Sequence, residues 1–182
     1  MFGKKNQLQF EYGTIMNTLH TDIAIIGAGT AGLAAYRAAR AAGKRALLIE
    51  GGPYGTTCAR VRCMPSKLLI AAAKATHSAK HAAAFGVHID GPMRVDGVDV
   101  MRRVRNESDR FVGFVLEGVE NISAQDKLHG YVRFVSDTVL RIDDHTEVQA
   151  SSVVIATGSR PMVPASFNEL GDRLIVNDDV FN

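Results

Sequence analysis

Tryptophan is absent from this 182-residue sequence, and cysteine occurs only twice. Without tryptophan the chain lacks one common stacking platform for nucleic-acid bases, and its formal net charge of +2 comes with no basic stripe. No apolar run approaches the length of a membrane span, and the N-terminal residues lack the continuous apolar core of a signal peptide. These absences argue against nucleic-acid and membrane partners and indicate a cytoplasmic protein.

The remaining composition is that of a globular protein. Hydrophobic residues make up 46% of the chain and charged residues 22%, which is enough for one domain with a sizeable core. Residues 1–15 are polar and aperiodic, and a second methionine, Met16, precedes the first strong pattern. We therefore expect residues 1–15 to be an extension outside the fold and residues 16–182 to form the domain.

The first strong pattern is a strand, a glycine-rich turn, a helix and a second strand. The apolar run Thr21–Ile26 leads directly into GAGTAG at positions 27–32, and a helix to Ala42 follows. A second apolar run, Ala46–Ile49, ends on Glu50. GxGxxG at a strand-to-helix turn, with an acidic residue about 20 positions on, is typical of a dinucleotide-binding βαβ unit.

Each glycine of that turn has an expected role. Gly27 permits the tight turn, Gly29 lets the backbone approach a pyrophosphate, and Gly32 allows the helix to lie close to the strand. The helix N-terminus attracts the anion, and Glu50 is expected to accept hydrogen bonds from an adenosine ribose. The alternative is a purely structural role, in which the glycines pack closely and bind no ligand. By itself the pattern fits NAD and FAD equally well.

The two cysteines lie in the stretch GGPYGTTCARVRCMPSK at positions 51–67. On one regular helix their Cα atoms would be more than about 7 Å apart, so a disulfide between Cys58 and Cys63 needs a distorted turn. Strained disulfides are more easily reduced and suit exchange chemistry. Two structural alternatives remain open: the cysteines could be two buried thiols or could form one structural disulfide. The absence of a CxxC motif argues against a zinc site. Positive charge on Arg60, Arg62 and Lys67 favours thiolates.

This stretch resembles the redox-active segment of the flavin-dependent pyridine nucleotide:disulfide oxidoreductases, most closely the dihydrolipoamide dehydrogenase branch. The family pattern reads GTxCxxxGCxPSK, and the chain matches it at Gly55, Cys58, Cys63, Pro65, Ser66 and Lys67. It departs from it at Arg62, where the family has glycine. The resemblance implies that FAD is the cofactor, that Cys58 exchanges with a dithiol substrate, that Cys63 faces the flavin and that Lys67 lies near it.

Helices and strands follow the cysteines. An alanine-rich helix is predicted from Lys67 to about Ala84, a loop over 85–97, and an amphipathic helix over 98–118. His77 and His81 lie four positions apart on the first helix, but without a third ligand an exposed face is the better interpretation and no metal site is predicted. Strands are predicted over 131–135, 138–142 and 147–150 as a small antiparallel meander. A buried strand over 152–155 then leads into ATGS at 156–159.

The resemblance covers roughly residues 21–182, nearly the whole chain, and it implies an α/β chain with an FAD/NAD(P)-binding, Rossmann-like three-layer fold and a small β-meander. Gly130 matches a family glycine near the adenine, and the ATGS backbone lies against FAD in the family. We therefore predict that the following residues bind the cofactor: Gly27, Gly29, Thr30, Ala31, Gly32, Glu50, Gly51, Gly55, Thr57, Cys58, Cys63, Lys67, Gly130, Ala156, Thr157, Gly158 and Ser159.

Family members continue with a nicotinamide domain for NAD or NADP and a dimerisation domain that carries a His/Glu acid/base pair. Neither segment is present in this sequence, so we expect the FAD portion of a longer, homodimeric enzyme that acts on a small-molecule or lipoyl dithiol. On its own the chain should turn over poorly. The alternative function is a dinucleotide-binding module whose thiol pair is a sensor or is not catalytic. A third, weaker alternative is a structural fragment with an empty site.

Overall fold

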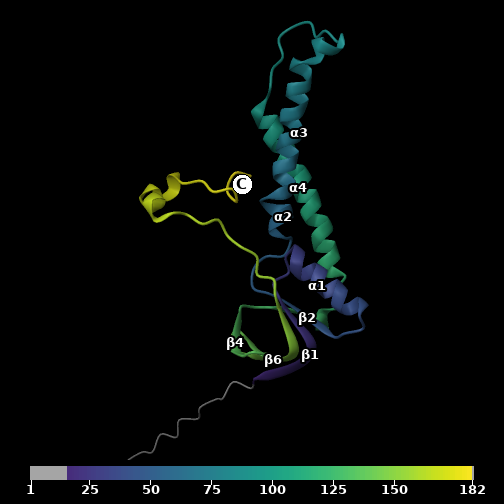
Figure 1. Ribbon diagram of the computed structural model, residues 1–182, viewed down its shortest axis with the longest axis vertical. Helices are drawn as coiled ribbons and strands as arrows, with labels where there is room; N and C mark the ends of the chain where they lie inside the picture. Colours follow the sequence, from purple (N-terminus) through teal and green to yellow (C-terminus); the bar gives the residue numbers. More distant parts are fainter. Residues whose placement is uncertain (1–15, 182) are drawn as a thin grey trace, which may run out of the picture.

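A six-stranded mixed sheet forms the centre of the computed structural model, which describes residues 16–181 (Figure 1). The predicted extension over residues 1–15 lies outside the described residues. The strands run in the order β3-β2-β1-β6-β5-β4, where β1, β2, β3 and β6 are parallel neighbours and β4, β5 and β6 are antiparallel. Their bounds are β1 Asn17–Ile26, β2 Ala46–Glu50, β3 Lys127–His129, β4 Val132–Ser136, β5 Val139–Ile142 and β6 Thr146–Ile155.

Two apolar cores, one on each face of the parallel strands, give the fold three layers. On one face, Leu33 and Tyr36 of α1 (Thr30–Ala41) and Val119 of α4 (Gly97–Glu120) share a core with alternate residues of β1 and β2. On the other face, Leu140 and Val148 of the β4-β5-β6 meander cover the intervening residues of the same two strands. This division follows from the side-chain alternation of strands. It confirms the predicted α/β three-layer fold with a small antiparallel meander.

The helices that carry the cysteines extend away from the sheet. A short helix, α2 (Thr57–Arg60), is followed by α3 (Cys63–Lys80), which contacts α4 and lies beside it (Figure 1). The 3-10 helices are η1 (Ala82–Phe85), η2 (Ala124–Asp126) and η3 (Ala165–Arg173). The sequence placed the start of the long helix after Lys67, which is wrong: α3 begins at Cys63 itself.

The last strand corrects two further predictions. β6 is one continuous strand, whereas the sequence suggested separate strands over 147–150 and 152–155. Its second half is not buried, since Ile155 is 67% exposed. The reason is topological: β5 pairs only with the first half of β6, so beyond Gln149 the strand pairs only with β1. β3 was not predicted, because three residues give too short a periodic signal.

None of the helices among residues 16–181 is both long and apolar enough to cross a membrane.

Candidate dinucleotide and redox site

Two glycines of the 27–32 turn are required by packing. Gly27 has φ of +104°, and a methyl group there would lie 2.4 Å from the carbonyl oxygen of Ala156. A methyl group on Gly32 would lie 1.8 Å from the carbonyl oxygen of Gly27. The Ala156 N–H also donates to the Ile26 carbonyl at 2.8 Å. The turn, the first turn of α1 and the segment after β6 are therefore in direct backbone contact. The sequence predicted the tight turn at Gly27 and the close approach of the helix at Gly32, but not the contact with the segment after β6.

Gly29 differs from these two glycines. Its φ of −73° and ψ of −174° are ordinary extended backbone, and a methyl group there would meet nothing within 4 Å. It is the N-cap residue of α1 and has no side chain to accept the free N–H groups of the first turn. The fold does not require glycine here. The open space before a helix N-terminus fits the close approach of an anionic ligand to the backbone.

Glu50 stabilises the glycine turn through hydrogen bonds to the backbone. Its carboxylate accepts the Ala28 N–H at 2.7 Å and the Gly52 N–H at 2.8 Å, one on each oxygen. Burial and, secondarily, the Glu50 charge raise the pKa of the neighbouring Tyr54. Each carboxylate oxygen can still accept a further hydrogen bond, so the predicted contact with a ribose hydroxyl stays available.

A groove of about 410 Å³ opens over this turn, within the size range of small-molecule sites. Nine predicted cofactor residues line it: Gly27, Gly29, Glu50, Gly51, Thr57, Gly130, Ala156, Thr157 and Gly158. The groove is not lined by Thr30, Ala31, Gly32, Gly55, Cys58, Cys63, Lys67 or Ser159. The sequence reasoning missed eight lining residues: Ile26, Ala28, Gly52, Pro53, Thr56, Arg60, Tyr131 and Val132.

Gly130 and Tyr131 shape the far end of this groove. Gly130 has φ of +153°, its N–H donates to the Glu50 carbonyl at 2.9 Å, and a methyl group there would lie 2.5 Å from Asp143 Oδ2. The Tyr131 ring covers Gly51, where a methyl group would lie 2.7 Å from a ring carbon. Tyr131 is 73% exposed, and its position next to Gly130 is the signal that could have identified it.

The cysteines lie on either side of the break between α2 and α3. Thr56, with φ of +57°, accepts the Ala59 N–H on its hydroxyl at 3.2 Å and so starts α2, which ends at Arg60. α3 starts at Cys63. The two thiols therefore do not lie on one regular helix, and the helix break between them is the kind of distortion that a Cys58–Cys63 disulfide would need. Both are free thiols here, Cys58 partly buried and Cys63 exposed.

The expected activation of both thiols by basic neighbours is wrong for Cys58. Its pKa is raised above the ordinary value, chiefly by a side-chain interaction with Cys63 and secondly by burial. The neighbouring sulfur thus has more effect on Cys58 than the basic residues of the stretch. A pair in which one thiol raises the pKa of the other holds its second proton to higher pH.

Cys58 opens into a second groove of about 360 Å³, which is bordered by α1, α2, the start of α3 and α4. Met64, Phe111 and Phe114 give this groove an apolar wall. The buried hydroxyl of Ser108 on α4 donates to the Ala59 carbonyl at 3.0 Å and holds α2 against α4. Cys58 therefore opens into a different groove from the one over the glycine turn.

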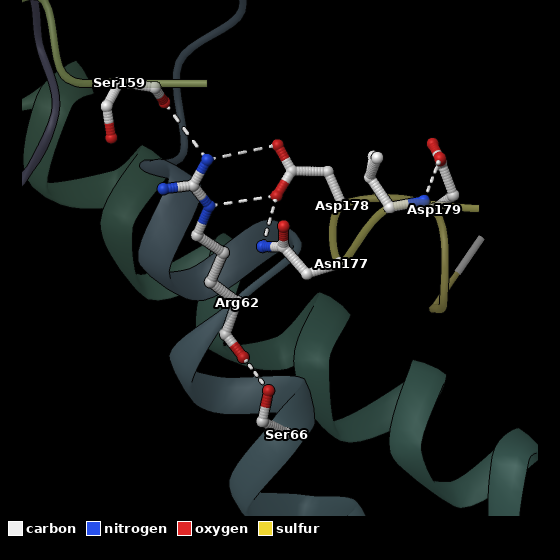
Figure 2. Close-up of polar contacts among 7 residues, drawn as sticks. Arg62, Ser66, Ser159, Asn177, Asp178 and Asp179 are labelled. Carbon is white, nitrogen blue, oxygen red and sulfur yellow. Dashed lines mark hydrogen bonds and ion pairs between the residues drawn. The ribbon is translucent and has the colours of Figure 1, made fainter. Parts of the chain in front are cut away.

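Arg62 contacts two residues of the chain after β6. Its guanidinium forms an ion pair with Asp178, with 2.9 Å between Nε and Oδ1, and donates to the Ser159 carbonyl at 3.1 Å (Figure 2). Ser159 thus contributes a contact to Arg62 here. Lys67 is exposed on α3, four residues after Cys63.

The histidine pair at the C-terminal end of α3 has no third metal ligand within the part of the chain that the structure describes. The rings of His77 and His81 are stacked, with centroids 4.1 Å apart, and among residues 16–181 no group of three metal-ligating side chains is assembled.

Comparison with known proteins identifies the family to which the chain is similar. The model of the family described as pyridine nucleotide-disulphide oxidoreductase matches residues 21–179. The chain is 34% identical over 149 residues to the dihydrolipoyl dehydrogenase of Chlamydia pneumoniae, covering 79% of this chain and 31% of that protein. It is 35% identical over 153 residues to the mercuric reductase of Streptomyces lividans, with the same two coverages. The chain therefore spans about a third of the length of these curated relatives.

Comparison with solved structures agrees with this family match. The HOCl-induced flavoprotein disulfide reductase RclA from Escherichia coli matches with a TM-score of 0.59 and 25% identity, over 79% of this chain and 29% of that one. The family match includes the glycine turn, both cysteines and the segment that pairs with Arg62. The predicted resemblance is confirmed: the chain belongs to the pyridine nucleotide-disulphide oxidoreductases, a family of FAD-dependent oxidoreductases.

Proposed function

We propose that this chain is the FAD-binding portion of a flavoprotein disulfide oxidoreductase that passes electrons between NAD(P)H, FAD, the Cys58–Cys63 pair and a dithiol substrate. The observation that carries the proposal is the open space at Gly29. Packing gives no reason for glycine at this N-cap position, where a side chain has room and the backbone is ordinary. A phosphate that approaches the N-terminus of α1 supplies that reason.

The groove over the glycine turn offers what FAD needs. Backbone N–H groups at the start of α1 suit the pyrophosphate, and the Glu50 carboxylate suits a ribose hydroxyl. Tyr131 borders the same groove with an exposed aromatic ring. When bound, FAD would supply two-electron redox chemistry. The assignments of Lys67 and Cys63 to the flavin environment follow from the family resemblance.

The thiol pair would react by exchange. A thiolate of the substrate attacks Sγ of Cys58 in the oxidised pair, the Cys58–Cys63 bond breaks, and Cys63 leaves as a thiolate. The second substrate thiol, after loss of its proton, attacks the substrate sulfur of the mixed disulfide, and Cys58 leaves. The substrate is thereby oxidised to a disulfide, and two electrons remain on the two cysteines. The separate groove beside Cys58 supports Cys58 as the thiol that meets the substrate.

A dihydrolipoamide-like dithiol is the substrate we propose for the full enzyme, because several of the curated relatives are dihydrolipoyl dehydrogenases. The mercuric reductase among them marks the other substrate class that this portion of the family serves. We further propose that the full enzyme is a homodimer.

A second function, a dinucleotide-binding module with sensor thiols, is favoured by one observation. The pKa of Cys58 is raised, which lowers its thiolate fraction at neutral pH. Such a module would bind FAD without exchanging its thiols with a dithiol substrate.

Trapping a mixed disulfide distinguishes these functions. The Cys63→Ser variant keeps Cys58, and the Cys58→Ser variant is its matched control. After incubation with oxidised lipoamide, intact-protein mass spectrometry should find the lipoamide adduct mainly on the Cys63→Ser variant. An adduct on neither variant would favour the sensor module, and an adduct mainly on Cys58→Ser would reverse the assigned roles.

A further inference from the structure

Arg60 of α2 is the one cationic side chain among the described residues that line the groove over the glycine turn. The other charged lining residue is Glu50, and its carboxylate already accepts backbone N–H groups from Ala28 and Gly52. The remaining lining residues are neutral, and most of them are glycine, alanine or threonine. An anionic ligand in this groove therefore meets the positive charge of one side chain, that of Arg60.

The Arg60 side chain is not used by the protein itself. Within residues 16–181 no carboxylate forms an ion pair with its guanidinium, and no acceptor forms a hydrogen bond with it. Arg62, two positions on, is different, because Asp178 and the Ser159 carbonyl hold its guanidinium. The N–H donors of the Arg60 guanidinium are therefore available to a ligand.

Gly55 makes room for the stem of Arg60. Gly55 is buried with φ of +114°, and a methyl group there would lie 3.2 Å from Arg60 Cδ and 3.1 Å from Val112 Cγ1. The aliphatic part of Arg60 therefore packs over the Gly55 backbone, as the stems of long charged side chains commonly do over buried surface. The hydrogen bond from Ser108 on α4 to the Ala59 carbonyl holds the same turn of α2 in place. The stem of Arg60 is thus positioned at the wall of the groove.

Thr57 adds a second free donor on the same helix. It precedes Arg60 by three positions on α2, so the two side chains are neighbours, and both residues line the groove. Its hydroxyl forms no hydrogen bond within the described part of the chain. The N-terminus of α1 borders the same groove at Gly29. Guanidinium, hydroxyl and backbone N–H groups are the donors that phosphate oxygens accept in proteins.

We propose that Arg60 binds the phosphates of the dinucleotide and makes this groove select a ligand that carries a diphosphate over a neutral nucleoside. The N-terminus of α1 supplies about half an elementary charge, which is less than a pyrophosphate carries. A guanidinium adds a full charge and paired N–H donors, the arrangement that suits phosphate oxygens. This inference rests on the proposed function, because it requires the dinucleotide to lie in this groove.

A solvated surface charge is the alternative for Arg60. In that case its removal weakens the binding of an anion only slightly, and to the same extent as removal of another exposed cation. Arg103 on α4 is the matched comparison, because it is exposed, has no ion pair within the described residues and does not line the groove. Direct contact with phosphate requires a large effect at Arg60 and almost none at Arg103.

The test measures ligand affinities of the 182-residue chain and of three variants. Arg60→Met keeps an unbranched stem over Gly55 and removes the guanidinium, Arg60→Lys keeps the charge, and Arg103→Met is the control. Titration of flavin fluorescence gives the dissociation constant of FAD, and NMR titration gives those of ADP and adenosine. Arg60→Met should weaken the binding of FAD and ADP about tenfold and change that of adenosine by less than about twofold. Arg60→Lys should lie between the parent and Arg60→Met, and Arg103→Met should stay within about twofold of the parent.

An Arg60→Met chain that binds FAD and ADP as tightly as the parent would overturn the proposal. An equal loss of adenosine affinity, or an equal loss of FAD affinity in Arg103→Met, would overturn it as well. Urea unfolding followed by circular dichroism checks that each variant is folded, and Arg60→Gln takes the place of Arg60→Met if that variant is unfolded. A parent chain that binds no FAD contradicts the proposed function as a whole, whereas FAD binding that does not depend on Arg60 contradicts this inference alone.

Discussion

Replacing Gly29 by alanine should weaken FAD binding and leave the fold intact. The backbone at Gly29 is allowed for alanine, and the new methyl group meets no protein atom within 4 Å. Reduced freedom of the unfolded chain stabilises the variant by about 0.4–1 kcal/mol, whereas alanine is a poorer N-cap residue than glycine. The free energy of unfolding should therefore change by no more than about 0.5 kcal/mol.

In the proposed function a phosphate approaches the backbone at this methyl group, so FAD affinity should fall at least tenfold, which is about 1.4 kcal/mol. Gly32→Ala is the contrasting variant, because its methyl group would lie 1.8 Å from the Gly27 carbonyl oxygen. That variant should lose about 3 kcal/mol of stability or more. Urea unfolding followed by circular dichroism measures the first quantity, and titration of flavin fluorescence measures the second. A folded Gly29→Ala chain with unchanged FAD affinity would refute the reasoning.

Three further outcomes are expected. Tyr36→Phe removes the 2.8 Å hydrogen bond to Asp126 Oδ2 and should lower the free energy of unfolding by about 1 kcal/mol, measured by urea titration. An unchanged free energy of unfolding would show that this hydrogen bond does not contribute to stability. In Cys63→Ala the pKa of Cys58 should fall towards its ordinary value, because Cys63 is the main cause of the increase; the alkylation profile of Cys58 should move to lower pH, and an unmoved profile would assign the increase to burial. Gly130→Ala should destabilise the chain by at least about 1 kcal/mol, because its φ is positive and a methyl group would overlap a carboxylate oxygen of the neighbouring turn; unchanged urea unfolding would contradict this.

The raised pKa of Cys58 also determines whether the free energy of unfolding rises or falls with pH. A thiol whose pKa is higher in the folded chain binds its proton more tightly there. Its contribution to the free energy of unfolding is fully present below the pKa of the thiol in the unfolded chain. That contribution is lost as the pH rises through the pKa of the thiol in the folded chain. Unfolding experiments above the ordinary range of a thiol should therefore show the parent chain losing stability relative to Cys58→Ser.

Local patterns predicted the part of the fold that local forces determine. The βαβ unit was predictable because strand periodicity, the GxGxxG spacing and the terminal acid all lie within 30 residues. The role of Gly32 was predictable for the same reason, since its contact is with Gly27 in the same turn. The spacing of the cysteines predicted only that a disulfide between them would need a distorted turn, and the structure has a helix break at that place.

The features that the sequence did not predict depend on contacts between distant segments. Arg62 and Asp178 are 116 positions apart, and nothing local to either residue marks the pair. The increased pKa of Cys58 depends on how close the two sulfurs come across the helix break, which charge counting along the chain does not capture. The exposure of Ile155 depends on where β5 stops pairing with β6, and an apolar run gives no information about that.

The visible absorption spectrum of the FAD-loaded chain tests the central claim most directly. The claim is that the glycine turn and Cys63 belong to one flavin site. After excess FAD is removed, the chain should retain one flavin, and anaerobic addition of a dithiol should produce a long-wavelength thiolate-to-flavin band that is missing in Cys63→Ser. Retained flavin without that band in the parent chain would contradict the claim and leave a dinucleotide-binding module.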